Sequence, residues 1–353
     1  MRGLGTFGLY GGDVRALVYD TFRGPLVVRE VADVIPHPHG VVVRVGATGV
    51  CRSDWHGWQG HDADITTFPH VPGHELAGTI AFVGAEVQNW QVGDRVTVPF
   101  VNACGVCVQC AEGNHQVCAH QRQPGFTHWG SMAELVALDA ADVNLVRLPD
   151  ALSFATAASL GCRYATAFRA VVQQGRVAPG EWVVVFGCGG VGLAAIQIAV
   201  AYGAHVVAAD ISPSALALAR QLGAAVTCAP ASAVPFVHET TGGGAHLTLD
   251  AFGSTQTCLD AIASLRPRGR HVQVGLMPDG PAPIPMGRVL SQELEILGSH
   301  GLAAHAYPEL LALVASGRLR PDLLLTREIS LDEAGEALSQ VGQIPGVTVI
   351  TQF

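Results

Sequence analysis

The second half of the chain alternates between short apolar runs and longer alanine-rich segments. Residues 182–186 and 205–209 are almost entirely apolar, as expected of strands buried on both faces. Residues 191–202 and 213–222 predict helices, each ended by a glycine and the second opened by a serine cap followed by proline. From about Ser153 onward, this alternation is typical of a parallel sheet with crossover helices. Further strands are expected at 246–249, 270–275, 294–298 and 347–351, and a further helix at 309–315.

The first half of the chain has shorter alternating segments, rich in valine, that are separated by turn residues. Residues 15–19 and 41–45 predict strands, and the glycines at 40, 46, 84 and 93 are interpreted as punctuation between strands. This half is therefore expected to be mainly β, as a barrel or a sandwich. The whole chain is predicted to be α/β, with a β-rich domain followed by a doubly wound parallel sheet.

The composition narrows the class of protein. Of the 353 residues, 49% are hydrophobic and 14% charged, which is typical of a compact globular chain of about two domains. The net charge of −9 argues against nucleic acid or an anionic membrane as the main partner. All 20 basic residues are arginine. Because Schiff-base catalysis and covalent attachment of pyridoxal phosphate need a lysine amine, both are excluded.

Whether the nine cysteines form disulfides or bind metal depends on the compartment in which the chain functions. Residues 1–13 are glycine-rich, lack a secretory signal and are expected to be a flexible extension. No apolar run is long enough to span a bilayer. A cytoplasmic location is therefore expected, and cysteines in a reducing compartment are more often metal ligands than disulfides.

Four cysteines within 15 residues form the most specific motif in the chain. Cys104, Cys107, Cys110 and Cys118 have the spacing C-x2-C-x2-C-x7-C. Four thiolates can surround one tetrahedral zinc ion and leave no open position, so this site is expected to be structural. Two local disulfides are the alternative, which the reducing compartment and the close spacing disfavour.

A glycine-rich segment between a predicted strand and a predicted helix indicates a dinucleotide site. Residues 187–192 match G-x-G-x-x-G. Gly187 permits the tight turn, Gly189 admits the pyrophosphate and Gly192 allows close packing of helix on strand, while Gly190 and Val191 open the helix. The alternative is a glycine-rich turn that binds no nucleotide.

Asp210 ends the next strand, 18 residues after the last glycine of this motif. Its carboxylate can accept hydrogen bonds from the adenosine ribose and would repel a 2′-phosphate. No arginine lies beside it in the sequence, which favours NAD over NADP.

The segment from Cys51 to Glu75 offers ligands for a second metal ion. Cys51 and His74 are residue types that bind zinc, and several polar residues lie close to them in the sequence. A catalytic zinc ion needs three protein ligands and an open position. Cys162, at the predicted junction of the two halves, is the candidate for the third ligand. The other cysteines, at positions 188, 228 and 258, are interpreted as apolar filling.

Together these motifs resemble the zinc-containing medium-chain alcohol dehydrogenases, over essentially all of the chain after its first residues. The matching segments are 51–56, 73–75, the four-cysteine segment, 161–162 and 187–192. The resemblance implies a GroES-like catalytic domain at 1–163, to which 300–353 returns, and a Rossmann NAD-binding domain at 164–299. It also implies a homo-oligomer, a dimer or a tetramer, paired through the nucleotide-binding domains.

The resemblance also assigns roles to individual residues. It implies that Cys51, His74 and Cys162 bind the catalytic zinc, and that Asp54 orients His74. Glu75 would approach the zinc when the bound water or alcohol exchanges. Asp54 as a turn cap and Glu75 as a structural carboxylate are the alternatives.

The mechanism implied for such a site is zinc-assisted hydride transfer from an alcohol to NAD, or the reverse from NADH to an aldehyde or ketone. Ser53 would take the alcohol proton and pass it through the nicotinamide ribose to His56, which releases it to solvent. An exposed His56 without a role is the alternative. Arg52 resembles the residue that contacts the cofactor pyrophosphate, and Thr166 the residue beside the nicotinamide.

The substrate pocket is the least defined part of the sequence. The aromatic residues expected to line it are Trp58, Phe100, Phe126 and Trp129, each of which could equally be core. His300 could reach the same region, whereas His61 and His70 are interpreted as surface loop residues. An apolar pocket suited to medium-sized alcohols is expected, with a small-molecule alcohol or carbonyl compound as substrate.

Two other functions remain open at this point. One is a polyol, threonine-type or formaldehyde-type dehydrogenase of the same fold, although polyol enzymes often replace the third thiol by a carboxylate. The other is a zinc protein that binds NAD without turnover. The combination of Cys51, Ser53, His56, His74 and Cys162 argues against a non-catalytic protein, which has no need of a proton relay.

Overall fold

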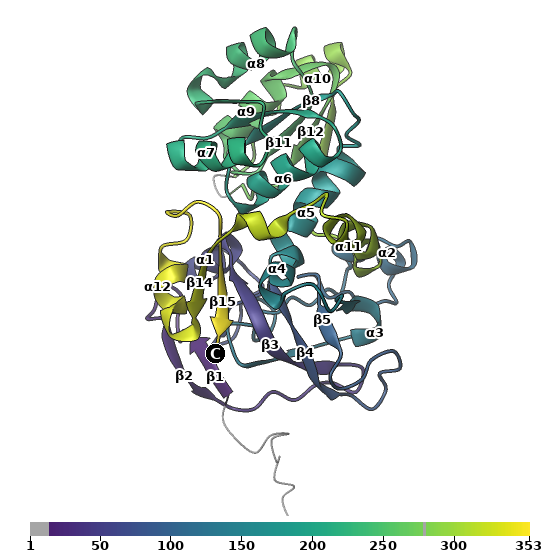
Figure 1. Cartoon of the computed structure of the whole chain (residues 1–353), viewed down its shortest axis with the longest axis vertical. Coiled ribbons are helices and arrows are strands. Elements are labelled where there is room, and N and C mark those ends of the chain that lie inside the picture. The colour runs from purple at the N-terminus through teal and green to yellow at the C-terminus, as the bar shows by residue number, and fades with distance from the viewer. Residues whose placement is uncertain (1–13, 278–279) are drawn as a thin grey trace, which may run out of the picture.

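The computed structural model describes residues 14–277 and 280–353, so the expected extension at 1–13 lies outside the described residues. The chain forms two lobes (Figure 1), a β-rich lobe drawn below and a lobe of alternating strands and helices drawn above. The helices α4 (Phe154–Ala158) and α5 (Ala165–Phe168) lie at their junction. Among the described residues, none of the helices is both long enough and apolar enough to span a bilayer.

The β-rich lobe is built on a seven-stranded sheet in the order β14-β15-β3-β4-β5-β7, with β6 paired to β3. Its strands are β3 (Val41–Val50), β4 (Leu76–Val83), β5 (Arg95–Thr97), β6 (Leu135–Leu138), β7 (Val146–Arg147), β14 (Leu325–Ser330) and β15 (Val347–Gln352). A separate antiparallel pair is formed by β1 (Val14–Val18) and β2 (Val27–Val31). Short helices complete the lobe: α1 (Arg52–Gln59), α2 (Val108–Ala111), α3 (Ala141–Asn144), α11 (Tyr307–Ala315) and α12 (Ala334–Ser339).

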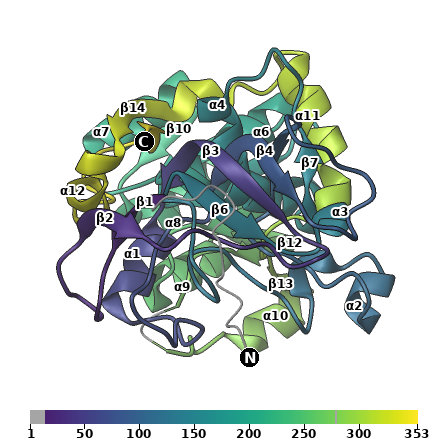
Figure 2. The same cartoon turned by 90° about the horizontal axis from the view of Figure 1, so that it is seen from below.

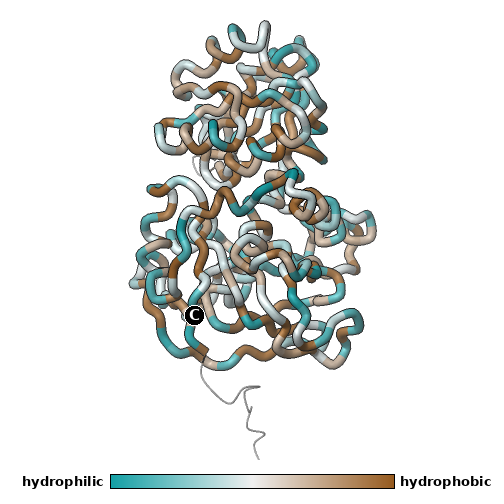
Figure 3. The backbone as a smooth tube through the Cα atoms, viewed as in Figure 1, coloured by the Kyte–Doolittle hydropathy of each residue, from teal (hydrophilic) through white to brown (hydrophobic). Residues whose placement is uncertain are grey.

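The other lobe is a six-stranded, fully parallel sheet in the order β10-β9-β8-β11-β12-β13. Its strands are β8 (Trp182–Phe186), β9 (His205–Ala209), β10 (Val226–Cys228), β11 (Ala245–Asp250), β12 (Leu265–Gln273) and β13 (Glu295–Gly298). The connecting helices are α6 (Gly190–Ala201), α7 (Pro213–Gln221), α8 (Ala233–Thr241), α9 (Thr255–Ala263) and α10 (Met286–Gln292). The central strands are buried on both faces, which confirms the predicted doubly wound sheet. Figure 3 shows hydrophobic segments, drawn in brown, in both lobes.

The last strand of the described chain supports the strand that leads to Cys51, the first predicted zinc ligand. β15 runs antiparallel to β3, with Thr348 opposite Val50 and Ile350 opposite Thr48. Val50 and Ile350 share one hydrophobic core with residues of α12. Figure 2 shows β14 and α12 on one side of the molecule and α3 and α11 on the other. The return of residues 300–353 to the β-rich lobe fits this pairing, while the exact domain boundaries stay predictions.

The predicted strands of the parallel sheet agree closely with the structure, whereas the role predicted for one glycine in the β-rich lobe is wrong. The strands at 182–186 and 205–209 have the predicted bounds. Gly46, predicted to separate strands, instead lies inside β3, which continues to Val50. A Cβ atom at Gly46 would lie 2.4 Å from the Phe154 ring. This glycine is therefore required by packing and not by a turn.

Candidate metal centres and nucleotide site

Three segments that are far apart in the sequence bring four potential metal ligands together at the junction of the lobes. Cys51 immediately precedes α1, His74 and Glu75 immediately precede β4, and Cys162 lies in the π-helical turn η2 (Leu160–Tyr164). One ligand atom from each of the four residues lies within 4.8 Å of those of the other three. Cys51, His74 and Glu75 are buried and Cys162 is partly buried. The structure thus brings together the three ligands that the sequence proposed.

The two nitrogens of the His74 imidazole test whether a metal ion fits this cluster. Nδ1 lies 2.8 Å from Oδ1 of Asp54, a carboxylate that also accepts the backbone N–H groups of Gly73 and Cys51. Nδ1 is therefore the protonated nitrogen. Nε2 is buried and has no hydrogen-bond partner among the described residues, whereas buried polar atoms are nearly always paired. A histidine held by a carboxylate on one side and unpaired beside two thiols is the arrangement of a zinc ligand.

The thiol of Cys51 lies in surroundings that favour its ionised form. A hydrogen bond from Cys162, together with the positive charge of Arg163, lowers the pKa of Cys51 well below its ordinary value. The same hydrogen bond and burial raise the pKa of Cys162. Because zinc binds thiolates, the Cys162 proton must leave when the metal enters.

Glu75 is held by a buried arginine that the sequence analysis did not single out. The backbone N–H and Nε of Arg163 both donate to Oε1 of Glu75, at 2.9 and 3.0 Å, and Nη2 donates to Oε2. Nη1 donates to the carbonyl oxygen of Val50 at 3.2 Å. Burial raises the pKa of Glu75, and the guanidinium opposes that rise. A bidentate ion pair thus fixes the Glu75 carboxylate beside the candidate metal ligands. Its partner, Arg163, directly follows Cys162 in the chain.

The four-cysteine motif forms a second cluster, on the segment around α2. The closest sulfur–sulfur distances among Cys104, Cys107, Cys110 and Cys118 are 3.5 to 4.0 Å. A tetrahedron with Zn–S bonds of about 2.3 Å has edges of about 3.8 Å, whereas a disulfide would need about 2.05 Å. All four cysteines are free. The geometry favours a closed zinc site over two disulfides.

The glycine-rich turn between β8 and α6 has a steric requirement at two of its three motif glycines. Gly187 has φ +90°, which favours glycine, and a Cβ atom there would lie 2.9 Å from Phe252. A Cβ atom on Gly192 would lie 1.8 Å from the carbonyl oxygen of Gly187, so helix and turn are in direct contact. A Cβ atom on Gly189 would meet no described atom within 4 Å. The protein itself does not demand glycine at 189, which is consistent with space kept for a ligand.

The remaining predicted cofactor residues lie around this turn or at the junction of the lobes. Oδ2 of Asp210 accepts the backbone N–H of Cys188 at 2.6 Å, which holds the carboxylate beside the glycine-rich turn. Thr166 is buried in α5. Arg52 is exposed at the start of α1, with its guanidinium 5.0 Å from the ring centre of Trp55. Gly190 and Val191 begin α6, and a Cβ atom on Gly190 would strike the Arg163 side chain at 2.5 Å.

Comparison with known proteins agrees with this geometry. Residues 37–150 match the alcohol dehydrogenase GroES-like domain family, and residues 190–316 match the zinc-binding dehydrogenase family. An alcohol dehydrogenase from Geobacillus stearothermophilus is 35% identical over 340 residues, which cover 96% of this chain and 99% of the relative. The chain belongs to the zinc-binding medium-chain alcohol dehydrogenase family. Zinc-dependent dehydrogenase activity linked to NAD(P) follows from this membership.

Solved structures of alcohol dehydrogenases have the same fold throughout. The enzyme TADH from Thermus sp. ATN1 is 33% identical, with a TM-score of 0.88 over 96% of this chain and all of the other. Benzyl alcohol dehydrogenase from Acinetobacter calcoaceticus is 26% identical, with a TM-score of 0.89 over 97% of this chain and 99% of the other. Other solved relatives hold NADP or NADH. Family membership thus accounts for both zinc clusters and for the glycine-rich turn.

The two residues proposed for the dehydrogenase proton relay lie on α1. The Ser53 hydroxyl is 3.9 Å from the Cys51 sulfur, close to the metal ligands. His56, one turn further along, is half-buried, and its Nδ1 lies 3.0 Å from Nδ1 of His61. His61 is exposed, as expected of a surface residue, but its contact with His56 was not foreseen. His70, also predicted at the surface, is buried, because its Nε2 bonds to the carbonyl oxygen of Gly125.

The predicted pocket aromatics divide into two groups around the dehydrogenase metal site. The rings of Phe100 and Phe126 lie 6.1 and 5.3 Å from the His74 ring, and His300 packs against Phe100 at 5.0 Å. Trp58 and Trp129 have their ring N–H groups hydrogen-bonded to the backbone, at Gly24 and Pro69 respectively. The two phenylalanines are therefore the better supported lining residues.

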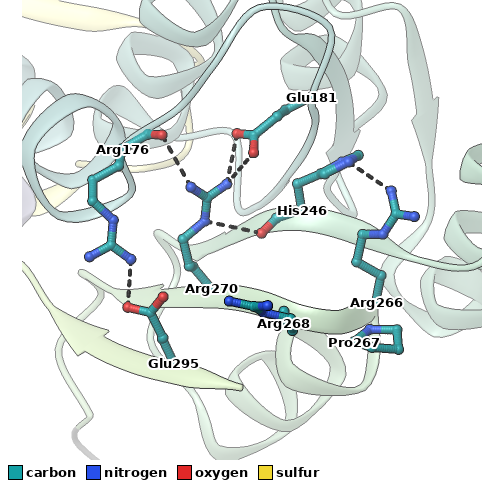
Figure 4. Close-up of a pocket in the computed structure, with 8 residues that line it drawn as sticks. All are labelled: Arg176, Glu181, His246, Arg266, Pro267, Arg268, Arg270 and Glu295. Atoms are coloured by element: carbon teal, nitrogen blue, oxygen red, sulfur yellow. Dashed lines mark hydrogen bonds and ion pairs between the residues drawn. The ribbon is translucent and has the colours of Figure 1, made fainter. Parts of the chain in front are cut away.

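A cavity of about 370 Å³ lies at the amino-terminal ends of strands β8, β11 and β13 of the parallel sheet (Figure 4). The glycine-rich turn follows the opposite end of β8. Arg270 donates to both carboxylate oxygens of Glu181, and Arg176 is paired with Glu295. This cavity is bordered by ion pairs that tie the strand ends together, and it has no part in the dehydrogenase site.

Proposed function

We propose that this chain interconverts primary or secondary alcohols with aldehydes or ketones, using NAD and two zinc ions, of which one is catalytic. The observation that carries the proposal is the buried Cys51, His74 and Cys162 cluster, in which Nε2 of His74 is unpaired. Aromatic side chains next to His74 fit an apolar substrate better than a polyol. A cysteine as third ligand also argues against a polyol dehydrogenase.

The chain's own residues provide positioning and a route for the proton. When bound, zinc supplies a Lewis acid that lowers the pKa of an alcohol, and NAD supplies the hydride acceptor. Cys51, His74 and Cys162 hold the metal, and Asp54 keeps the His74 ring in the tautomer that leaves Nε2 free. Phe100 and Phe126 exclude water beside His74.

Ser53 and His56 would move the alcohol proton away from the buried site. Ser53 is partly buried beside Cys51, where its hydroxyl can accept a proton as it donates its own. Burial and the positive charge of Arg52 lower the pKa of His56. A neutral imidazole can accept a proton and release it again, because a lowered pKa makes the charged form short-lived.

Asp210 is proposed to select NAD, and its replacement tests this choice. Asp210→Ser should lower kcat/KM for NAD about tenfold or more, since a hydrogen bond to a charged group contributes about 1.5–3 kcal/mol. It should raise kcat/KM for NADP, because the 2′-phosphate no longer meets a carboxylate. Initial rates with both cofactors measure the change. An unaltered preference would contradict the assigned role.

A substrate panel tests the proposed function itself. We expect absorbance of reduced nicotinamide to appear with NAD and primary or secondary alcohols, and only weakly with polyols, threonine or formaldehyde–thiol adducts. Rates with NAD should exceed rates with NADP. Tight NAD binding without turnover on any substrate would favour the non-catalytic alternative.

The chain is also proposed to form a homo-oligomer in the cytoplasm. β13 is an edge strand of the parallel sheet, and exposed apolar side chains lie on it and on α10: Met286, Leu290 and Ile296 are 63%, 81% and 37% exposed. An exposed apolar edge of this kind is typical of a surface that pairs with another chain.

A further inference from the structure

The turn that ends α1 places two histidines next to each other. Gly60 has φ +80°, a left-handed conformation that ends the helix, and its N–H bonds to the carbonyl oxygen of Gly57 at 3.0 Å. The N–H of His61 then bonds back to the carbonyl oxygen of His56, also at 3.0 Å. This local backbone pattern turns the chain so that residue 61 lies over residue 56.

The two imidazoles are joined through their Nδ1 atoms, 3.0 Å apart. A bond at this distance requires one Nδ1 to carry the proton and the other to accept it. Trp55 packs nearly perpendicular to both rings, with its ring centre 5.0 Å from that of His56 and 5.9 Å from that of His61. Arg52 covers the Trp55 ring. Both imidazoles are thus held in place by aromatic packing as well as by their mutual bond.

The two histidines differ in their exposure to solvent. His56, on α1, is partly buried, whereas His61, just beyond the end of this helix, is exposed. Burial, followed by the charges of Arg52 and His61, lowers the pKa of His56, whereas Cys51 acts in the opposite direction. Because the protonated form of His56 is disfavoured, a proton that reaches its ring is readily released, and its Nδ1 is already bonded to Nδ1 of His61.

We propose that His61 is the second member of the proton path and accepts the proton that His56 releases. This inference rests on the proposed function. As a proton binds Nε2 of His56, the Nδ1–H bond of His56 breaks and an Nδ1–H bond forms on His61. The Nε2–H bond of His61 then breaks and its proton goes to water. No charge remains on the pair, and His56 is left with the Nε2–H group that the reverse reaction, carbonyl reduction, requires.

Two replacements of His61 separate proton transfer from positioning. His61→Ala removes the ring. His61→Asn keeps a polar atom near the position of Nδ1 of His61, where it can still bond to His56, but cannot relay a proton. We expect both to lower kcat for alcohol oxidation about 3- to 10-fold at low buffer concentration in the zinc-loaded enzyme. This is less than the 10²- to 10⁴-fold that a direct acid–base group contributes, because water partly replaces an outer group. Added imidazole buffer at constant pH should restore both variants.

The exposed His39, ion-paired with Glu86, provides the matched control. His39→Ala should keep the wild-type rate without any response to imidazole. An Asn variant with wild-type kcat and no buffer response would overturn the proton path and leave His61 as a positioning residue only. Unchanged rates in both variants would also overturn it.

A second readout does not depend on turnover. Nitrogen-15 NMR of the imidazole rings should show that His56 and His61 titrate as a coupled pair, and that His56 titrates alone in His61→Ala. Independent titrations in the wild type would overturn the inference while leaving the proposed function intact. A wild-type enzyme that oxidises no alcohol would overturn the proposed function, and the inference with it.

Discussion

His74→Ala should abolish alcohol oxidation, with kcat at least about 10³-fold lower, a loss of about 4 kcal/mol of transition-state stabilisation. The replacement removes the unpaired Nε2 and leaves Cys51 and Cys162 as the only strong ligands of the catalytic cluster. Zinc should fall from two ions per chain, one for each cluster, to one. Steady-state rates with NAD and metal analysis of the dialysed protein measure both effects. Cys51→Ser should behave in the same way.

Cys107→Ser is the control from the other cluster. It removes one of four ligands of a closed site, so thermal stability and solubility should fall while the folded fraction keeps its kcat. If His74→Ala retained both zinc ions with full activity, or if Cys107→Ser alone abolished the chemistry, the assignment of the two clusters would be wrong.

Arg163→Leu should lower the free energy of unfolding by about 3–5 kcal/mol, because it leaves the Glu75 carboxylate buried without its partner. The hydrogen bond to the carbonyl oxygen of Val50 is lost as well. Urea unfolding of the zinc-loaded protein, followed by fluorescence, measures the loss. Catalysis should also suffer, since the released carboxylate lies beside the metal ligands.

The double variant Glu75→Gln with Arg163→Leu isolates the charge effect. A neutral amide beside leucine leaves no unpaired charge, so part of the stability lost in the single variant should return. A double variant as unstable as the sum of its single changes would show that packing, and not the buried charge, determines the cost.

Much of the fold was readable from the sequence because its signals are local. The strands of the parallel sheet are apolar throughout, and Ser212 caps α7 by accepting the N–H of Ala215. The glycine motif was recognisable because its three glycines fall within six residues, directly between an apolar strand and a helix. The two clusters of candidate zinc ligands were recognisable because four cysteines at short spacing, and a cysteine beside a histidine motif, are patterns typical of metal sites.

The features that escaped prediction depend on partners far away in the sequence. Arg163 is buried because Glu75, 88 residues earlier, meets it in space. His70 is buried because Gly125 provides an acceptor 55 residues later. Gly46 lies inside a strand because Phe154, 108 residues later, packs on it. No pattern within a short window carries such information, since each pairing is created by the tertiary fold.

The pairing of β15 with β3 also sets an order of events during synthesis. The register places Val50 opposite Thr348, which is synthesised about 300 residues after it. At about 5–20 residues per second, roughly 15 to 60 s separate the emergence of these two strands from the ribosome. All six strands of the parallel sheet emerge within that interval. The nucleotide-binding lobe can therefore fold before β15 has been synthesised. Until then β3, which leads directly to Cys51, lacks one of its neighbouring strands.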